Sequence, residues 1–393
     1  MYDPLFLIPL GIIIGIITGL LPSIHINLIA ALFLSFSLPF SPEASAVLII
    51  VIATTHILTE IIPTTYLGVP DDELFIIAQP AQQLTKEGRA TEAITSYHLG
   101  TLLGMILLLP LIPLFLLVLP PLYPLLIPLI PYLLLLFSLY LILRAENPLI
   151  AIVVFILAGY LGLITLHVPL KEPLLPLLTS LFGLPALMNT LATTTTHYPQ
   201  KKIPITLPPL KELKAITFLA TITAPPGAIV PSIGGAHSLA LASEIKELKT
   251  KALLMLQGAT TLITFALSFA TLLAINKART GTAAFIQQTL SSFTLLTLIK
   301  LTTLILITLV FLLPLLYVLT KLLEKIIQKI NYKRLALLTL LFILTLNTLI
   351  AGPISLLILV AGTSIGLYAL KTNTRPINLL SALLIPTILN YLV

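Results

Sequence analysis

Long runs of apolar residues without a charged side chain constrain this chain more than any other feature. The longest run covers residues 93–143 and contains no Asp, Glu, Lys or Arg. Only 9% of the 393 residues are charged, whereas a soluble domain carries roughly a quarter. A helix of about 20 apolar residues spans the hydrocarbon core, and the runs lack the alternation of a membrane barrel. We therefore expect an all-α polytopic membrane protein of about 10–12 helices.

The remaining composition excludes several classes of site. The chain has no cysteine, so disulfides and thiolate metal sites cannot form. The formal net charge of +7 is attributed to basic cytoplasmic loops, and no basic stretch is interleaved with aromatics, so nucleic-acid binding is not expected. The first apolar run lacks a basic leader and indicates a membrane helix rather than a cleaved signal. We expect a multi-pass protein of the cell membrane, in contact with its lipid.

An internal repeat divides the chain. The triplet Pro22-Ser23-Ile24 recurs 209 residues later as Pro231-Ser232-Ile233, each time after an apolar run that contains glycine. The same offset matches the loops 67–72 and 276–281. Hydrophobic segments interrupted at corresponding positions of two halves are typical of transporters. We predict two related halves, 1–200 and 201–393, of inverted topology.

The two interruptions predict a binding site. Proline and glycine end a helix, and lipid cannot satisfy the freed backbone groups. The segments after each break hold about 15 apolar residues or fewer, too few to span the membrane, which predicts broken or re-entrant helices. A restarting helix presents unpaired N–H groups to an anion. The candidate ligand residues, which could instead cap and pack the breaks, are Pro22, Ser23, His25, Asn27, Pro231, Ser232, Gly234 and Gly235.

A second set of polar residues is a candidate for coupling or gating. His56 and Glu60 share a helix face and form either a proton relay or a structural pair, because polar groups in membrane helices are costly. The acidic residues 71–73 either bind a cation, receive a basic residue of the other half, or are solvated. The set comprises His56, Glu60, Asp71, Asp72, Lys277 and Arg279.

The other histidines have different interpretations. His237 lies near the second break and could mirror His25, although the two are out of register. We expect His98, His167 and His197 near helix ends, at the membrane interfaces.

Several motifs carry a family resemblance over roughly residues 5–290. Each half has a glycine-rich element that leads to its break, and in both the residue after the proline is Ser rather than the expected Gly. The motifs are Gly15-Ile-Ile-Thr-Gly19-Leu-Leu-Pro22-Ser23-Ile24-His25, Gly227-Ala-Ile-Val-Pro231-Ser232-Ile233-Gly234-Gly235-Ala236, Leu67-Gly68-Val69-Pro70-Asp71, Lys86-Glu87-Gly88-Arg89-Ala90-Thr91-Glu92-Ala93 and Asn276-Lys277-Ala278-Arg279-Thr280-Gly281. The chain resembles the TctA-like family, the large permease subunit of tripartite tricarboxylate transporters, and most closely its archaeal branch.

The resemblance implies a secondary transporter that moves an anionic solute of the di- or tricarboxylate type by alternating access, with H⁺ or Na⁺ as coupling ion and no other cofactor. It also implies a periplasmic binding protein and a small membrane subunit as partners. Nothing in the chain itself shows either partner, and a homodimer is also open.

One alternative uses the same breaks differently. A polyprenyl-phosphate translocase would hold a lipid phosphate at the two helix N-termini. An enzyme is not expected, because no HExxH, P-loop or GxSxG element is present. We therefore assign no catalytic residue and no metal site.

Overall fold

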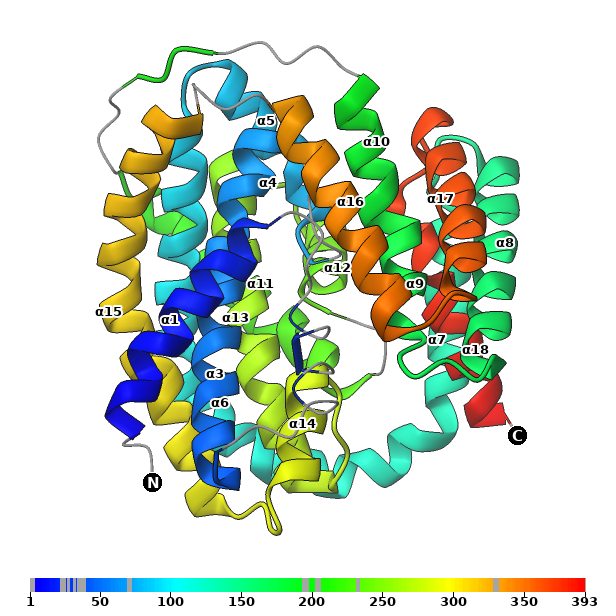
Figure 1. Cartoon of the computed structure of the whole chain (residues 1–393). Helices are drawn as coiled ribbons and strands as arrows, with labels where there is room; N and C mark the ends of the chain where they lie inside the picture. The colour runs from blue at the N-terminus through cyan, green and yellow to red at the C-terminus, as the bar shows by residue number, and fades with distance from the viewer. Residues whose placement is uncertain are drawn as a thin grey trace. The chain divides into compact units, whose positions relative to one another are not determined.

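The structure is a computed structural model (Figure 1), and it describes residues 4–21, 26, 29, 30, 33, 40–68, 73–192, 198–201, 206–230, 234–327 and 332–392. Regular structure in these residues is helical throughout. Within the described residues, five helical stretches are long and apolar enough to cross a membrane, and five further apolar helices are shorter. These findings confirm the predicted all-α polytopic membrane fold.

The chain forms two compact units. Unit 1 comprises residues 1–120 and 196–330, and unit 2 comprises residues 121–195 and 331–393. Each unit therefore draws on both predicted halves. The boundaries after residues 120 and 330 lie 210 residues apart (330 − 120), which matches the repeat offset of 209 to within one residue.

Unit 1 contains the elements on either side of the two breaks. Its helices are α1 (Pro4–Leu20), α3 (Pro42–Thr59), α4 (Ile61–Leu67), α5 (Phe75–Lys86), most of α6 (Ala90–Leu126), α11 (Leu210–Ile229), α12 (Gly235–Ile245), α13 (Thr250–Ile275), α14 (Gly281–Thr289) and α15 (Leu295–Ile327). At the start of α3 the Ser41 hydroxyl accepts the Ala44 N–H, and Pro42 occupies the first turn. α3 and α13 are almost completely buried, so they form the centre of this unit.

Helices α1 and α3 run parallel and in close contact. Gly11, Gly15 and Gly19 of α1 lie against Val51, Thr55 and Thr59 of α3, in that order. Both series advance four residues per step in the same direction, which defines the parallel packing. Glycine is required because a Cβ on Gly15 would lie 2.5 Å from the Thr55 Cβ.

Helices α11 and α13 repeat this packing 209 residues later. The Thr264 hydroxyl donates to the Ala224 carbonyl over 3.2 Å, and Thr271 donates to Ala228 over 2.8 Å. Ala224 and Thr264 are the counterparts of Gly15 and Thr55 at the offset of 209. Helix α11 also ends at residue 229, the counterpart of the last residue of α1.

The two parallel pairs point in opposite directions. Helix α4, which continues α3, ends beside the end of α5, because the Thr85 hydroxyl donates to the Thr65 carbonyl over 2.9 Å. Gln200 bonds the Thr85 carbonyl and the Ala90 N–H, and Lys251 in the first turn of α13 pairs with Glu92. Helix α13 thus begins at the end of unit 1 where α4, the continuation of α3, terminates. This is the inverted arrangement that the sequence predicts.

Unit 2 is built from the remaining parts of both halves. Its helices are α7 (Ile130–Leu143), α8 (Pro148–His167), α9 (Leu174–Leu178), the π-helical turn η2 (Thr179–Gly183), α10 (Leu184–Ala192), α16 (Tyr332–Ile350), α17 (Ser355–Lys371), the short η3 (Pro376–Leu380) and α18 (Ser381–Leu392). Two contacts of this unit occur in corresponding forms. Helix α7 packs on α18, and correspondingly α16 packs on α10. Helix α8 also packs on α18, and correspondingly α17 packs on η2. Gly162 of α8 lies against Ala382 of α18, and Gly362 of α17 lies against Ser180 of η2. The division of the chain at 200/201 stays a prediction, but the repeated contacts extend into this unit.

Candidate functional site

Helices α11 and α12 form a hairpin around the second break. α12 has 11 residues, too few to span a bilayer. The Lys251 ammonium, just after α12, donates to the Thr206 hydroxyl, just before α11, over 2.8 Å. The chain therefore returns to the end from which it entered. This geometry is the one expected of a re-entrant segment, and it places the N-terminus of α12 inside unit 1.

A carboxylate occupies the N-terminus of α12. The Ala236 N–H donates to Glu73 Oε2 over 3.3 Å, across 163 positions of sequence. A Cβ on Gly235 would lie 2.8 Å from the same oxygen, and one on Gly234 would overlap the carboxylate. The two glycines thus let an anion approach the first turn of the helix, where its dipole and N–H groups favour negative charge.

The buried amide of Gln257 lies beside this carboxylate. Gln257 Nε2 donates to the Glu73 backbone carbonyl over 3.0 Å and to the Thr261 hydroxyl over 2.9 Å. The Thr261 hydroxyl in turn lies 2.9 Å from the position of a Gly235 Cβ. Gln257 is fully buried, and its Oε1 has no hydrogen-bond partner among the described residues. Helix α13 therefore contributes a polar face to the α12 N-terminus.

His237 contributes to the same turn. Its Nδ1 accepts the Gly234 N–H over 3.1 Å, so this nitrogen carries no proton. The side chain is buried. His237 therefore caps the helix start and holds the backbone that receives the carboxylate.

His56 and Glu60 form the close pair that their spacing predicts. His56 Nε2 lies 3.6 Å from Glu60 Oε2, both side chains are buried, and His56 Nδ1 lies 3.1 Å from the Thr18 hydroxyl of α1. Glu60 sits at the junction of α3 and α4. Pro63 follows and has no N–H for the Thr59 carbonyl, which weakens the helix there.

Helix α6 holds this junction from the other side. The Tyr97 hydroxyl donates to the Ile57 carbonyl, and His98 Nε2 lies 2.9 Å from the Leu58 carbonyl. Both side chains are buried. His98 is therefore a buried partner of the α3 backbone, and its predicted position at a membrane interface stays a prediction.

Lys277 and Arg279 lie in the loop from α13 to α14. Asn276 caps the C-terminus of α13 with a φ of +52°, as Gly68 with +65° caps α4 in the matched loop. The loop then folds back, because the Thr280 and Ser268 hydroxyls lie 3.2 Å apart. Thr282 follows, fully buried, and its hydroxyl lacks a hydrogen-bond partner in the described part of the chain.

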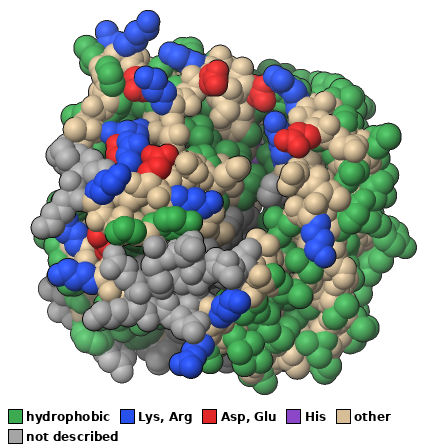
Figure 2. Space-filling view, turned by 90° about the horizontal axis from the view of Figure 1, so that it is seen from above, with side chains coloured by type: hydrophobic (Ala, Val, Ile, Leu, Met, Phe, Trp, Pro, Cys, Tyr) green, Lys and Arg blue, Asp and Glu red, His purple; other side chains and the backbone are tan. Residues whose placement is uncertain are grey.

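Charged residues join several elements at one end of unit 1. We call Arg89, Glu92, Gln200 and Lys251 the basic-end clasp. Glu92 receives Arg89 Nε at 2.7 Å and Lys251 Nζ at 3.0 Å. The hydrogen bond to Glu92, with a smaller contribution from Glu87, raises the pKa of the Arg89 guanidinium against the opposing effect of burial. Figure 2 views the molecule from the end where α5 terminates and shows many Lys and Arg side chains together with acidic ones.

The structure thus brings together part of the predicted site. Gly234 and Gly235 lie at the carboxylate, and His56 pairs with Glu60. Sequence reasoning missed Gln257 and Thr261, which occupy one helix face at a spacing of four residues within a hydrophobic run. The predicted residues that lie outside the described part of the chain are Pro22, Ser23, His25, Asn27, Asp71, Asp72, Pro231, Ser232 and His197.

A family model described as "Tripartite tricarboxylate transporter TctA family" matches residues 5–381. The chain is 32% identical, over the full length of both proteins, to an uncharacterized protein of the archaeon Methanocaldococcus jannaschii, MJ1079. No solved structure matches the chain.

Proposed function

Because the chain belongs to the tripartite tricarboxylate transporter TctA family, a family of secondary transporters rather than enzymes, we propose that it carries a di- or tricarboxylate across the cell membrane by alternating access. The coupling ion in this proposal is H⁺ or Na⁺. The proposed partners, which follow from membership of this family, are a substrate-binding protein and a small membrane subunit.

One observation carries the proposal: a carboxylate is seated on the N-terminus of α12. The Ala236 N–H donates to Glu73 Oε2, and two glycines leave room for it. A substrate carboxylate has the same charge and the same acceptor geometry. The site that holds Glu73 is therefore chemically suited to one end of a dicarboxylate.

The surroundings suit a site with changing access. The turn of the α11–α12 hairpin and the junction between α3 and α4 both lie inside unit 1. The junction carries the buried His56–Glu60 pair. Titratable groups inside a membrane helix are costly and commonly mark a functional site, and we assign these two residues to coupling or gating.

Thermal stability with and without ligand tests the proposed function. The chain has no Trp and no Cys, so circular dichroism at 222 nm in detergent is a suitable readout. The panel contains citrate, other di- and tricarboxylates, inorganic phosphate and a polyprenyl phosphate. We expect carboxylates to raise the melting temperature, because a ligand that binds only the folded state stabilises it by mass action.

Variants link the shift to the breaks. We expect His25→Ala and Asn27→Ala to reduce the carboxylate-induced shift. His167→Ala is the matched control, because His167 is an exposed histidine at the end of α8 whose Nδ1 lies 2.7 Å from the Leu163 carbonyl. Equal shifts in all three variants would contradict a site at the first break.

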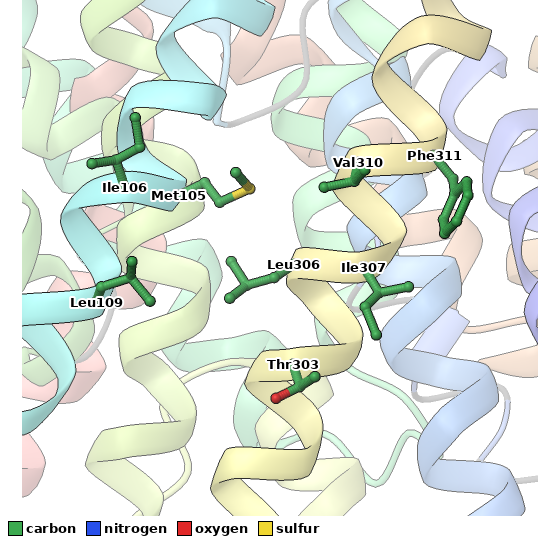
Figure 3. Close-up of a pocket in the computed structure, with 8 residues that line it drawn as sticks. All are labelled: Met105, Ile106, Leu109, Thr303, Leu306, Ile307, Val310 and Phe311. Atoms are coloured by element: carbon green, nitrogen blue, oxygen red, sulfur yellow. The ribbon is translucent and has the colours of Figure 1, made fainter.

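A second candidate function rests on a groove in unit 1. Met105, Ile106 and Leu109 of α6 and five residues of α15 line a space of about 270 Å³, and all eight are apolar except Thr303 (Figure 3). An acyl or prenyl chain fits such a lining, as a polyprenyl-phosphate translocase would require. A melting-temperature shift with the polyprenyl phosphate alone would support this function and would reject the carboxylate transporter.

A further inference from the structure

The α12 N-terminus cannot hold two carboxylates in the same place. Glu73 Oε2 accepts the Ala236 N–H and lies within contact of the Gly234 and Gly235 positions. A substrate carboxylate at this turn requires the same N–H groups. Two negative groups at one helix terminus would also repel each other. Binding of the substrate therefore requires Glu73 to leave or to lose its charge.

Beside Glu73 lies a second group, the Gln257 amide, whose oxygen requires a hydrogen-bond donor. Gln257 Oε1 is fully buried and has no hydrogen-bond partner among the described residues. The orientation of the amide is fixed, because Nε2 faces two acceptors, the Glu73 carbonyl and the Thr261 hydroxyl. The oxygen can only accept. A buried acceptor without a donor is unfavourable, and the carboxyl of Glu73 is a donor only when it is protonated.

We propose that Glu73 is the proton carrier of the transport cycle and that it exchanges places with the substrate. The ionised Glu73 occupies the α12 N-terminus in the empty protein. A proton from water converts the carboxylate to the carboxylic acid, which donates its O–H to Gln257 Oε1. The N–H groups of the first turn of α12 are then open to a substrate carboxylate. Release of the substrate and of the proton on the other side restores the ion.

Several titratable groups face Glu73 from the elements around it. Helix α12 contributes His237, whose Nδ1 accepts the Gly234 N–H at the same turn. Helix α6 contributes Tyr97, which both Glu73 and Glu60 influence electrostatically. Helix α13 contributes Gln257 and Thr261, which do not titrate. Substitution of Glu73 itself is therefore needed to separate its proton from those of its neighbours.

The inference rests on the proposed function, and citrate is the probe. We would measure citrate affinity of the purified full-length protein from pH 5 to pH 8, for the wild type and for Glu73→Gln. The ionisation of citrate itself changes over this range. Both proteins meet the same citrate species at each pH, so the ratio of their dissociation constants isolates the proton on the protein.

We expect the wild type to lose affinity relative to Glu73→Gln as the pH rises. The ratio should approach a tenfold increase for each pH unit above the pKa of Glu73, because one proton is taken up with the ligand. The variant is always neutral and lacks this dependence. Parallel affinity curves for the two proteins would overturn the proposal.

Two further variants keep the test decisive. Glu87→Gln removes an exposed carboxylate and should follow the wild-type curve. Gln257→Met removes the acceptor for the protonated carboxyl at similar volume, so its affinity should begin to fall at a lower pH than that of the wild type. An unshifted Gln257→Met curve would contradict the role of Gln257. Absence of citrate binding at every pH would reject the carboxylate function instead, which separates the two failures.

Discussion

Single glycines determine how closely the helices of unit 1 approach. Gly11, Gly15 and Gly19 repeat every four residues on α1, and their counterparts at the offset of 209 are Ala220, Ala224 and Ala228. Small residues allow contact between helix backbones in a bilayer, where apolar burial gives no drive to associate. This second match to the repeat was present in the sequence, and it supports the duplication more strongly than the Pro-Ser-Ile triplet does.

Gly15→Ala tests this contact. A Cβ at residue 15 would lie 2.5 Å from the Thr55 Cβ and 2.8 Å from the Ile52 carbonyl oxygen, so α1 and α3 must separate. We expect a loss of about 1–3 kcal/mol in the free energy of unfolding, as for other overpacked sites. A lower melting temperature by circular dichroism would show it.

The matched control is Ile17→Ala on the exposed face of the same helix. It should leave the melting temperature nearly unchanged. If Gly15→Ala melts no lower than Ile17→Ala, the close α1–α3 contact does not contribute to stability.

At the scale of elements, the broken segments were predictable in kind but not in their contacts. Glycine and proline around residues 225–235 identify an interruption, and the length of α12 follows from the polar residues after it. The seating of Glu73 on α12 was not predictable, because the two are 163 residues apart and no local pattern joins them. The acidic loop 71–73 suggested a cation site, an ion pair or solvated charges, whereas Glu73 accepts a hydrogen bond from a helix N–H.

The basic-end clasp makes a prediction at the same scale. Glu92 is buried and receives both Arg89 and Lys251, so it joins the start of α6 to the start of α13. We expect Glu92→Gln to lower the free energy of unfolding by about 2 kcal/mol, because two hydrogen bonds from charged donors are weakened.

Glu87→Gln supplies the comparison. Glu87 is exposed and binds the same Arg89, at 3.0 Å. Exposed ion pairs contribute little, so its melting temperature should stay near that of the wild type. Similar losses in both variants would show that the clasp does not hold α6 to α13.

On the scale of the whole molecule, the all-helical fold and the inverted repeat followed from hydropathy and from one repeated motif. The sequence did not predict that each of the two units combines segments from both halves. This combination depends on contacts such as α8 with α18, which join segments more than 200 residues apart.

The basic end of unit 1 predicts the orientation in the membrane. Lys251, Lys321 and Arg89 lie at this end, and positive residues favour the cytoplasmic side. The chain has no cysteine, so the wild type gives no background with a membrane-impermeant maleimide. In intact cells we expect Ser292→Cys, between α14 and α15, to react, and Glu247→Cys, between α12 and α13, to stay protected until the cells are opened.

Both positions are exposed in the structure. The reversed labelling pattern would invert the orientation. Labelling of both cysteines in intact cells would contradict the hairpin of α11 and α12.

The interleaved units also have a consequence for biosynthesis. A ribosome makes residues 1–120 first, but these pack against residues 196–330, and residues 121–195 wait for 331–393. Neither unit can close until most of the chain has left the ribosome. The early helices must therefore reside in the membrane before their later partners exist. The insertion machinery or the lipid must tolerate groups such as Glu73 and Glu92 until Ala236 of α12 and Lys251 of α13 arrive.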